Sequence, residues 1–280
     1  IVDTIVVNLF KDAKPTGVTG AVDEALSGAI TDLVEGGDFK GKSGEIAVVY
    51  PRGTIPAKRV LVVGLGKKDG FDLESVRTAT ANAIKKAGSL NASQVATILH
   101  GADAGGLDIE DIAQAITEAS LLALYNYRGQ KSKEKSESSV ESIDLMVVDD
   151  GDMPTVGAGI NTGIAIAEGV VVTRDLVNLP PNICTPAFMA ETAEKIASES
   201  DLRVEVLEKK QMETLKMGAL LGVAQGSETP PRFIILEHNA DKKDTLDTVV
   251  LVGKGVTFDT GGYSLKTRDG MVGMKSDMAG

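Results

Sequence analysis

The stretch Arg59-Val60-Leu61-Val62-Val63-Gly64-Leu65 is apolar, rich in β-branched residues and as long as a buried strand. A glycine-rich turn that ends at Gly70 follows it, and residues 73–87 beyond the turn form an alanine-rich run with helical spacing. Strand, turn and helix in this order are the repeating unit of layered α/β proteins. The stretch therefore predicts an α/β layer.

The same alternation continues on both sides of this unit. The predicted strands are residues 1–10, 45–50, 93–99 and 143–148, and the predicted helices are residues 18–34 and 109–127. Residues 129–139 contain no apolar side chain and mix charges with serine, which is typical of a solvated surface loop. We expect residues 1–150 to form one N-terminal α/β domain.

A second domain is expected over residues 151–280. A long apolar helix, residues 157–179, connects the two domains, and Pro180 and Pro181 end it because proline cannot continue a helix. Thr185 followed by Pro186 predicts the start of a helix that extends to about residue 198. Strands at residues 203–207, 232–236 and 248–252 and a helix at residues 209–217 then begin a second α/β unit, which we expect to be incomplete at residue 280.

Composition limits the possible partners. The 280 residues carry 29 Lys and Arg against 40 Asp and Glu, a net charge of -11 that is spread evenly along the chain and makes nucleic acid an unlikely partner. The single cysteine cannot form an intramolecular disulfide, and no basic stretch precedes an apolar signal segment, so we expect a cytoplasmic protein. No apolar run approaches the roughly 20 residues of a membrane-spanning helix, so no membrane association is expected.

Four features are weak functional signals. The glycines from Gly64 to Gly70 nearly match a dinucleotide fingerprint, but the third glycine comes one residue too late, so a plain turn is favoured and no cofactor is assigned. His100 and His238 have no second His or Cys at ligand spacing and are interpreted as ordinary hydrogen-bonded histidines. Cys184 has no nearby His and is interpreted as a small buried thiol.

The most informative segment is Lys254-Gly-Val-Thr-Phe-Asp259-Thr-Gly-Gly-Tyr-Ser-Leu-Lys266, with Met274 and Asp277 shortly after it. It begins where an apolar strand is predicted to end, which is where α/β sheets bind ligands, and its glycines allow the backbone to approach a ligand closely. Two carboxylates and two lysines there can form ion pairs or a metal cluster, in which a lysine would bind as the neutral amine. Spacing alone favours the ion pairs.

Two segments resemble a known family, the leucyl (cytosol) aminopeptidases of the M17 metallopeptidases. The first is the glycine-rich loop just described, and the second is Arg174-Asp-Leu-Val-Asn-Leu-Pro-Pro-Asn-Ile-Cys-Thr-Pro186. The resemblance implies an N-terminal macro-like mixed-sheet domain followed by the first part of a zinc-peptidase-like α/β catalytic domain. It also implies peptide substrates with a free N-terminus and a homo-hexamer in the cytoplasm.

The resemblance assigns a role to each polar residue of the loop. It implies two divalent metal ions per subunit, Zn²⁺ or Mn²⁺ with Mg²⁺ or Co²⁺ as alternatives. Lys254 would bind one ion, Asp259 would bridge both, and Asp277 would complete the lysine-bearing site. Lys266 would act in catalysis by polarising the scissile carbonyl, and Met274 would line the pocket for the substrate's N-terminal side chain.

The sequence departs from the family pattern in one large respect. The family's remaining acidic ligands and its bicarbonate-holding arginine belong to a motif that these 280 residues do not contain. We therefore expect this segment alone to be inactive. The rival hypothesis is a non-catalytic α/β binding module in which Lys254, Asp259 and Asp277 form only structural ion pairs.

Overall fold

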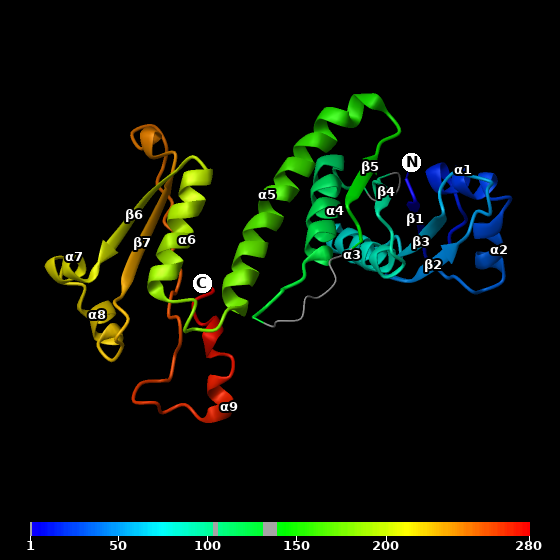
Figure 1. The fold of residues 1–280 in the computed structure, drawn as a ribbon. Coiled ribbons are helices and arrows are strands. Elements are labelled where there is room, and N and C mark those ends of the chain that lie inside the picture. The colour runs from blue at the N-terminus through cyan, green and yellow to red at the C-terminus, as the bar shows by residue number, and fades with distance from the viewer. Residues whose placement is uncertain (1, 103–105, 131–138) are drawn as a thin grey trace. The chain divides into compact units, whose positions relative to one another are not determined.

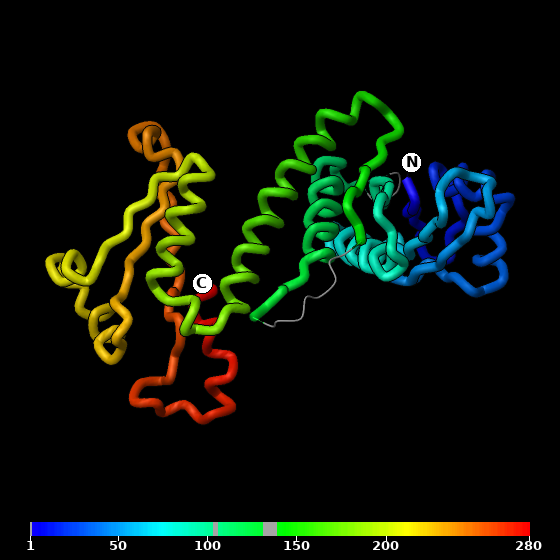
Figure 2. The backbone as a smooth tube through the Cα atoms, viewed as in Figure 1, coloured from blue at the N-terminus to red at the C-terminus, as the bar shows by residue number. Residues whose placement is uncertain are grey.

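The computed structural model describes residues 2–102, 106–130 and 139–280, and the chain folds as two compact units, Ile1–Val172 and Thr173–Gly280 (Figures 1 and 2). The division falls inside a long helix, whereas the sequence places a domain boundary near residue 150. That boundary stays a prediction. The two units are defined by how the chain packs on itself, whereas the predicted boundary separates two domains of the sequence. Most of the surface loop expected at residues 129–139 lies outside the described residues.

The first unit is built on a five-stranded sheet of mixed direction. Its spatial order is β2-β3-β1-β4-β5, with β2 antiparallel to β3 and the other neighbours parallel. The strands are β1 (Thr4–Phe10), β2 (Ile46–Val49), β3 (Arg59–Gly66), β4 (Gln94–Ile98) and β5 (Ser142–Met146). The predicted α/β class and mixed sheet are confirmed.

Helices cover both faces of this sheet. Leu61 and Val63 of β3 pack with α3 (Leu73–Ser89) and α4 (Ile109–Leu124), whereas Val60 and Val62 face α1 (Gly17–Ala25) and α2 (Ala29–Glu35). A strand with both faces buried reads as a continuous apolar run, which explains the sequence of β3. The single helix expected over residues 18–34 is wrong, because Ser27 and Gly28 both have positive φ and break it into α1 and α2.

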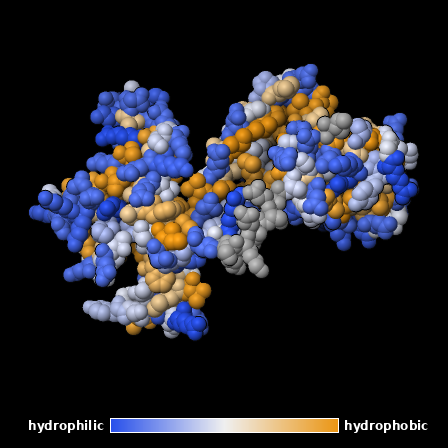
Figure 3. Space-filling model, viewed as in Figure 1, coloured by the Kyte–Doolittle hydropathy of each residue, from blue (hydrophilic) through white to orange (hydrophobic). Residues whose placement is uncertain are grey.

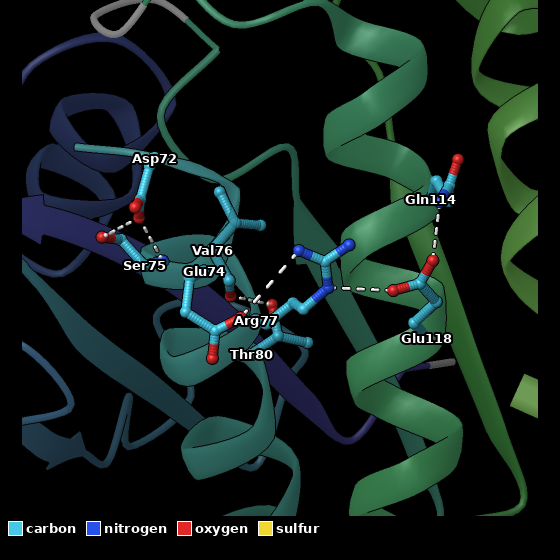
Figure 4. Close-up of polar contacts among 8 residues, drawn as sticks. All are labelled: Asp72, Glu74, Ser75, Val76, Arg77, Thr80, Gln114 and Glu118. Carbon is cyan, nitrogen blue, oxygen red and sulfur yellow. Dashed lines mark hydrogen bonds and ion pairs between the residues drawn. The ribbon is translucent and has the colours of Figure 1, made fainter. Parts of the chain in front are cut away.

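A partly buried ion pair joins the two helices on one face. Arg77 of α3 donates from Nε to Glu118 of α4 at 2.9 Å, and Gln114 donates to the other oxygen of the same carboxylate at 2.7 Å (Figure 4). Asp72 caps the start of α3 by accepting from the Ser75 amide. Glu118 is only 7% exposed, so these two donors compensate a charge that would be costly to bury alone.

The connecting helix α5 (Met153–Asn178) begins four residues earlier than the predicted residue 157 and ends one residue earlier than the predicted residue 179. Its apolar side chains gather along its length (Figure 3), and Ile164 and Ile166 are 37% and 42% exposed. Together with the preceding turn it is long and apolar enough to cross a membrane by length and composition, so the expectation that no such run exists is wrong. Glycine, asparagine and threonine residues interrupt the apolar sequence of α5 without adding charge. Core helices of soluble proteins also have this composition and are mostly buried, whereas 22% of the most apolar 18 residues of this helix are buried.

Two glycines of α5 let it approach α4 closely. A Cβ atom on Gly159 would lie 2.2 Å from the Glu110 carbonyl oxygen, and one on Gly163 would lie 2.8 Å from the Gln114 carbonyl oxygen. Both distances are shorter than real carbon–oxygen contacts, so only glycine fits at these positions. The N-terminal half of α5 is thereby packed closely on α4 within the first unit.

The second unit has a smaller sheet of two antiparallel strands, β6 (Leu202–Glu208) and β7 (Arg232–His238). Helix α6 (Pro186–Glu199) packs against both strands through buried alanines, and Thr185 caps it by accepting from the Phe188 amide. The remaining helices are α7 (Lys209–Thr214), α8 (Gly218–Ala224) and α9 (Arg268–Met271). The predicted N-cap at Thr185 and the strands at residues 203–207 and 232–236 are confirmed.

The strand expected at residues 248–252 is wrong. Its four apolar residues, Val249 to Val252, have exposed fractions of 75–92%, and none of the described residues pairs with them in a sheet. A strand requires a hydrogen-bonded neighbour, which the apolar composition of a segment cannot supply by itself.

Candidate metal-binding loop

The loop of residues 253–280 returns on itself so that its two ends touch. A Cβ atom on Gly253 would lie 2.3 Å from the Gly280 carbonyl oxygen, and one on Gly280 would lie 2.7 Å from the Lys254 amide nitrogen. Only glycine at both positions permits this approach of one backbone to the other. The sequence analysis assigned the glycines to contact with a ligand, whereas these two bring Lys254 beside Asp277.

A tight turn holds Asp259 in place. The Gly261 amide donates to Asp259 Oδ1 at 2.7 Å, and Gly261 has a φ of 83°, a conformation that favours glycine. This backbone hydrogen bond and the Lys266 ammonium lower the pKa of the Asp259 carboxyl. Asp259 is therefore ionised at neutral pH and available to a cation.

Lys254 lies between two carboxylates. Its Nζ atom is 2.9 Å from Asp277 Oδ2 and 4.0 Å from Asp259 Oδ2. The hydrogen bond with Asp277 raises the pKa of the Lys254 ammonium. A metal ion at this amine would therefore have to displace a proton that the pair with Asp277 holds in place.

Lys266 and Met274 form the other side of the cluster. Lys266 Nζ lies 3.0 Å from Asp259 Oδ2 and donates to Met274 Sδ at 2.9 Å. Thioether sulfur is a weak acceptor, so the aspartate is the stronger partner. The structure thus brings together all five residues that the sequence analysis singled out: Lys254, Asp259, Lys266, Met274 and Asp277.

The donor set fits part of a metal site. Asp277 Oδ2 is buried and, apart from its ion pair with Lys254, makes no hydrogen bond of normal geometry to the described residues. Such an oxygen is suited to a cation. However, within residues 2–102, 106–130 and 139–280 no three or more His, Cys, Asp or Glu side chains form a metal-binding group. Two aspartates and one lysine are fewer ligands than a pair of ions needs.

Lys275 is a polar residue of this loop that the sequence analysis missed. Its Nζ atom donates at 2.8 Å to the carbonyl oxygens of both Val177 and Asn178, at the end of α5. A lone lysine within a glycine-rich loop carries no signal of such a contact. The partner carbonyls lie nearly a hundred residues earlier in the chain.

The residues of the weak signals make contacts within the protein itself. A Cβ atom on Gly64 would lie 2.0 Å from the Lys42 carbonyl oxygen, so this glycine accommodates a neighbouring loop of the protein itself. His100 is buried between Asn8 and Thr97, each 3.3 Å from one ring nitrogen. His238 is exposed and contacts the Asn239 side chain. Cys184 is buried, which raises the pKa of its thiol and makes it a poor nucleophile.

Comparison with known proteins gives the same family for both parts of the chain. The family model described as the N-terminal domain of the cytosol aminopeptidase family matches residues 6–134, and the model described as its catalytic domain matches residues 171–280. The probable cytosol aminopeptidase of Bacillus subtilis (strain 168) is 38% identical over 279 residues, which cover 99% of this chain and 55% of that protein. The probable cytosol aminopeptidase of Ralstonia nicotianae is 40% identical over 283 residues, covering 99% and 56%.

Solved structures with the same fold include a mutant of tomato leucine aminopeptidase, with a TM-score of 0.78 and 30% identity. The bottromycin maturation enzyme BotP in complex with Mn has a TM-score of 0.77 and 27% identity. Each comparison covers 100% of this chain and 54% of the other. The chain therefore spans about half the length of the relatives that it matches.

Proposed function

This chain belongs to the cytosol aminopeptidase family, and from that premise we propose that the whole protein is a metal-dependent aminopeptidase. It would hydrolyse the first peptide bond of peptides, with leucine among the residues released. The observation that carries the proposal is the convergence of Lys254, Asp259, Asp277 and Lys266 within a single loop.

The carboxylates of the loop would hold the metal ions. Asp259, with its lowered pKa, would serve both ions, whereas Lys254 and Asp277 would serve one of them. Two bound divalent ions supply the Lewis acidity that activates a water molecule and the charge that holds the free amine of the substrate. The requirement for a free amine would restrict cleavage to the N-terminal residue.

Lys266 would act on the scissile carbonyl. Its ammonium lies 3.0 Å from Asp259 Oδ2, so it is held next to the proposed metal position and can stabilise the negative charge that develops on the carbonyl oxygen. Met274, in contact with the same ammonium, would form an adaptable apolar wall for the substrate's side chain.

The proposal extends to the ions and the assembly. We expect Zn²⁺ or Mn²⁺, and the structure of BotP in complex with Mn supports manganese. A homo-hexamer in the cytoplasm would follow the family pattern, and the names of the relatives as cytosol aminopeptidases support that location.

Metal content tests the proposal against the rival hypothesis of plain ion pairs. The full-length protein, incubated with Mn²⁺ and desalted, should retain about two ions per chain and hydrolyse leucyl p-nitroanilide. Asp259→Ala should lose most of this metal, because its ionised carboxylate is one of the two in this loop that would hold the ions. Asp269→Ala, an exposed aspartate of the same loop, is the matched control and should retain it. A folded wild type that retains no metal would favour the ion-pair hypothesis.

A further inference from the structure

Two carbonyl oxygens at the C-terminal end of α5, those of Val177 and Asn178, accept hydrogen bonds from a residue outside the helix. The last four carbonyls of a helix lack intrahelical donors. Here the Leu179 amide donates to the Asp175 and Leu176 carbonyl oxygens, and the next two residues, Pro180 and Pro181, have no N–H to donate. Lys275 supplies a donor, because its ammonium lies 2.8 Å from both the Val177 and the Asn178 carbonyl oxygens. A cation at this position also interacts favourably with the negative end of the helix dipole.

The backbone on either side of Lys275 is itself held in a tight turn. The Ser276 amide and hydroxyl both donate to the Gly273 carbonyl oxygen, at 3.0 and 2.6 Å, and the Asp277 amide lies 3.3 Å from the Met274 carbonyl oxygen. Fixing the Lys275 side chain therefore fixes the direction of the whole turn. Asp277 and Met274, the potential metal ligand and pocket residue, lie on the two sides of Lys275.

We propose that Lys275 is a positioning residue, which ties the turn at residues 274–277 to the end of α5 and so orients Asp277 for metal binding. The inference rests on the proposed metal-dependent function. Lys275 itself contacts neither metal nor substrate, since both of its observed partners are backbone carbonyls of a helix. Groups that orient a ligand in this way change metal affinity even though they never touch the ion.

The test measures Mn²⁺ affinity in the full-length protein. Lys275→Met keeps most of the side-chain length and removes the donor, and it should raise the dissociation constant for Mn²⁺ about tenfold or more. Lys275→Arg can donate to two carbonyls and should restore most of the affinity. Lys195→Met is the matched control, since Lys195 is an exposed lysine of α6 paired with Glu199 at 3.8 Å, and it should leave the affinity unchanged.

Two further measurements separate positioning from a general loss of stability. Saturating Mn²⁺ should recover most of the kcat of Lys275→Met, because the metal can then order the turn at higher concentration. Hydrogen exchange should accelerate at the amides of residues 274–280 and remain unchanged in β6 and β7. If Lys275→Met does not fold, Lys275→Gln, which keeps a shorter donor, should show an intermediate loss of affinity.

The possible outcomes are distinct. Wild-type protein that binds neither Mn²⁺ nor Zn²⁺ would overturn the proposed function, and this inference with it. If wild type and the folded Lys275→Met variant bind Mn²⁺ with equal affinity, this inference is overturned and the proposed function stands. A loss of kcat that saturating Mn²⁺ does not recover, with unchanged Mn²⁺ affinity, would assign Lys275 a role other than positioning Asp277.

Discussion

Acidification should destabilise the first unit through His100, a histidine whose ring is uncharged in the folded protein. The ring is fully buried two residues after the end of β4, and burial lowers its pKa from 6.5 to about 4. Asn8 and Thr97, the partners of the two ring nitrogens, are both uncharged. If the Asn8 amide donates to Nδ1, then Nε2 carries the ring proton and donates it to Thr97. An additional proton would break this arrangement.

The sign and size of the effect follow from the two pKa values. Below pH 6.5 the unfolded chain binds a proton at His100, whereas the folded chain does not until the pH approaches 4. The free energy of unfolding therefore falls as the pH falls through this interval and is fully retained above it. At about 1.4 kcal/mol per pH unit, the loss approaches roughly 3 kcal/mol. This is a large part of the stability of a typical domain, about 5–15 kcal/mol.

Urea unfolding, followed by far-ultraviolet circular dichroism at pH 7.5, 6.5, 5.5 and 4.5, measures this loss. Carboxylates also titrate near the lower end, so the informative quantity is the difference between wild type and His100→Gln, which keeps a donor and an acceptor without titrating. The variant should lose less stability than wild type over this range. His238→Gln, at the only other histidine, is the control and should follow wild type. Parallel losses in wild type and His100→Gln would refute the reasoning.

Two predictions concern the loop of residues 253–280. Lys266→Ala in the full-length protein should retain its metal and lower kcat about 10²-fold, and Lys266→Arg should not restore it fully because the guanidinium differs in shape and hydration. An unchanged kcat on leucyl p-nitroanilide would remove Lys266 from the mechanism. Residues 1–280 expressed alone should hold at most one weakly bound ion by elemental analysis and show no hydrolysis. Chelator-sensitive hydrolysis by this segment would require a different ligand set.

The sequence predicted the layered part of the fold well, because its signals are local. The apolar run of β3 lies within one strand, and the alanine-rich spacing of α3 lies within a few turns of one helix. The break between α1 and α2 was missed, because Ser27 is not a typical residue for a positive φ and the apolar spacing continues across it. The segment from Val249 to Val252 was misassigned because strand formation depends on a partner rather than on composition alone.

That the polar residues of the candidate site lie together was predictable for the same reason of locality, whereas their roles in metal binding and catalysis stay predictions. Its polar residues lie within a single stretch from Lys254 to Asp277, so the loop's own motif carried the information. What could not be predicted is the contact between Gly253 and Gly280, or between Lys275 and the end of α5. Both depend on how segments distant in sequence meet, and neither changes the pattern of residue types along the chain.

The charges of the loop constrain how many ions it can hold. Asp259 and Asp277 balance the two ammonium groups of Lys254 and Lys266, so the cluster without metal is neutral and held by ion pairs. One divalent ion, bound with loss of the Lys254 proton, leaves a net charge of one positive unit. A second ion raises the excess to three, a charge that a partly enclosed cluster cannot hold without further anionic ligands. Only additional carboxylates from outside this loop would make two ions stable.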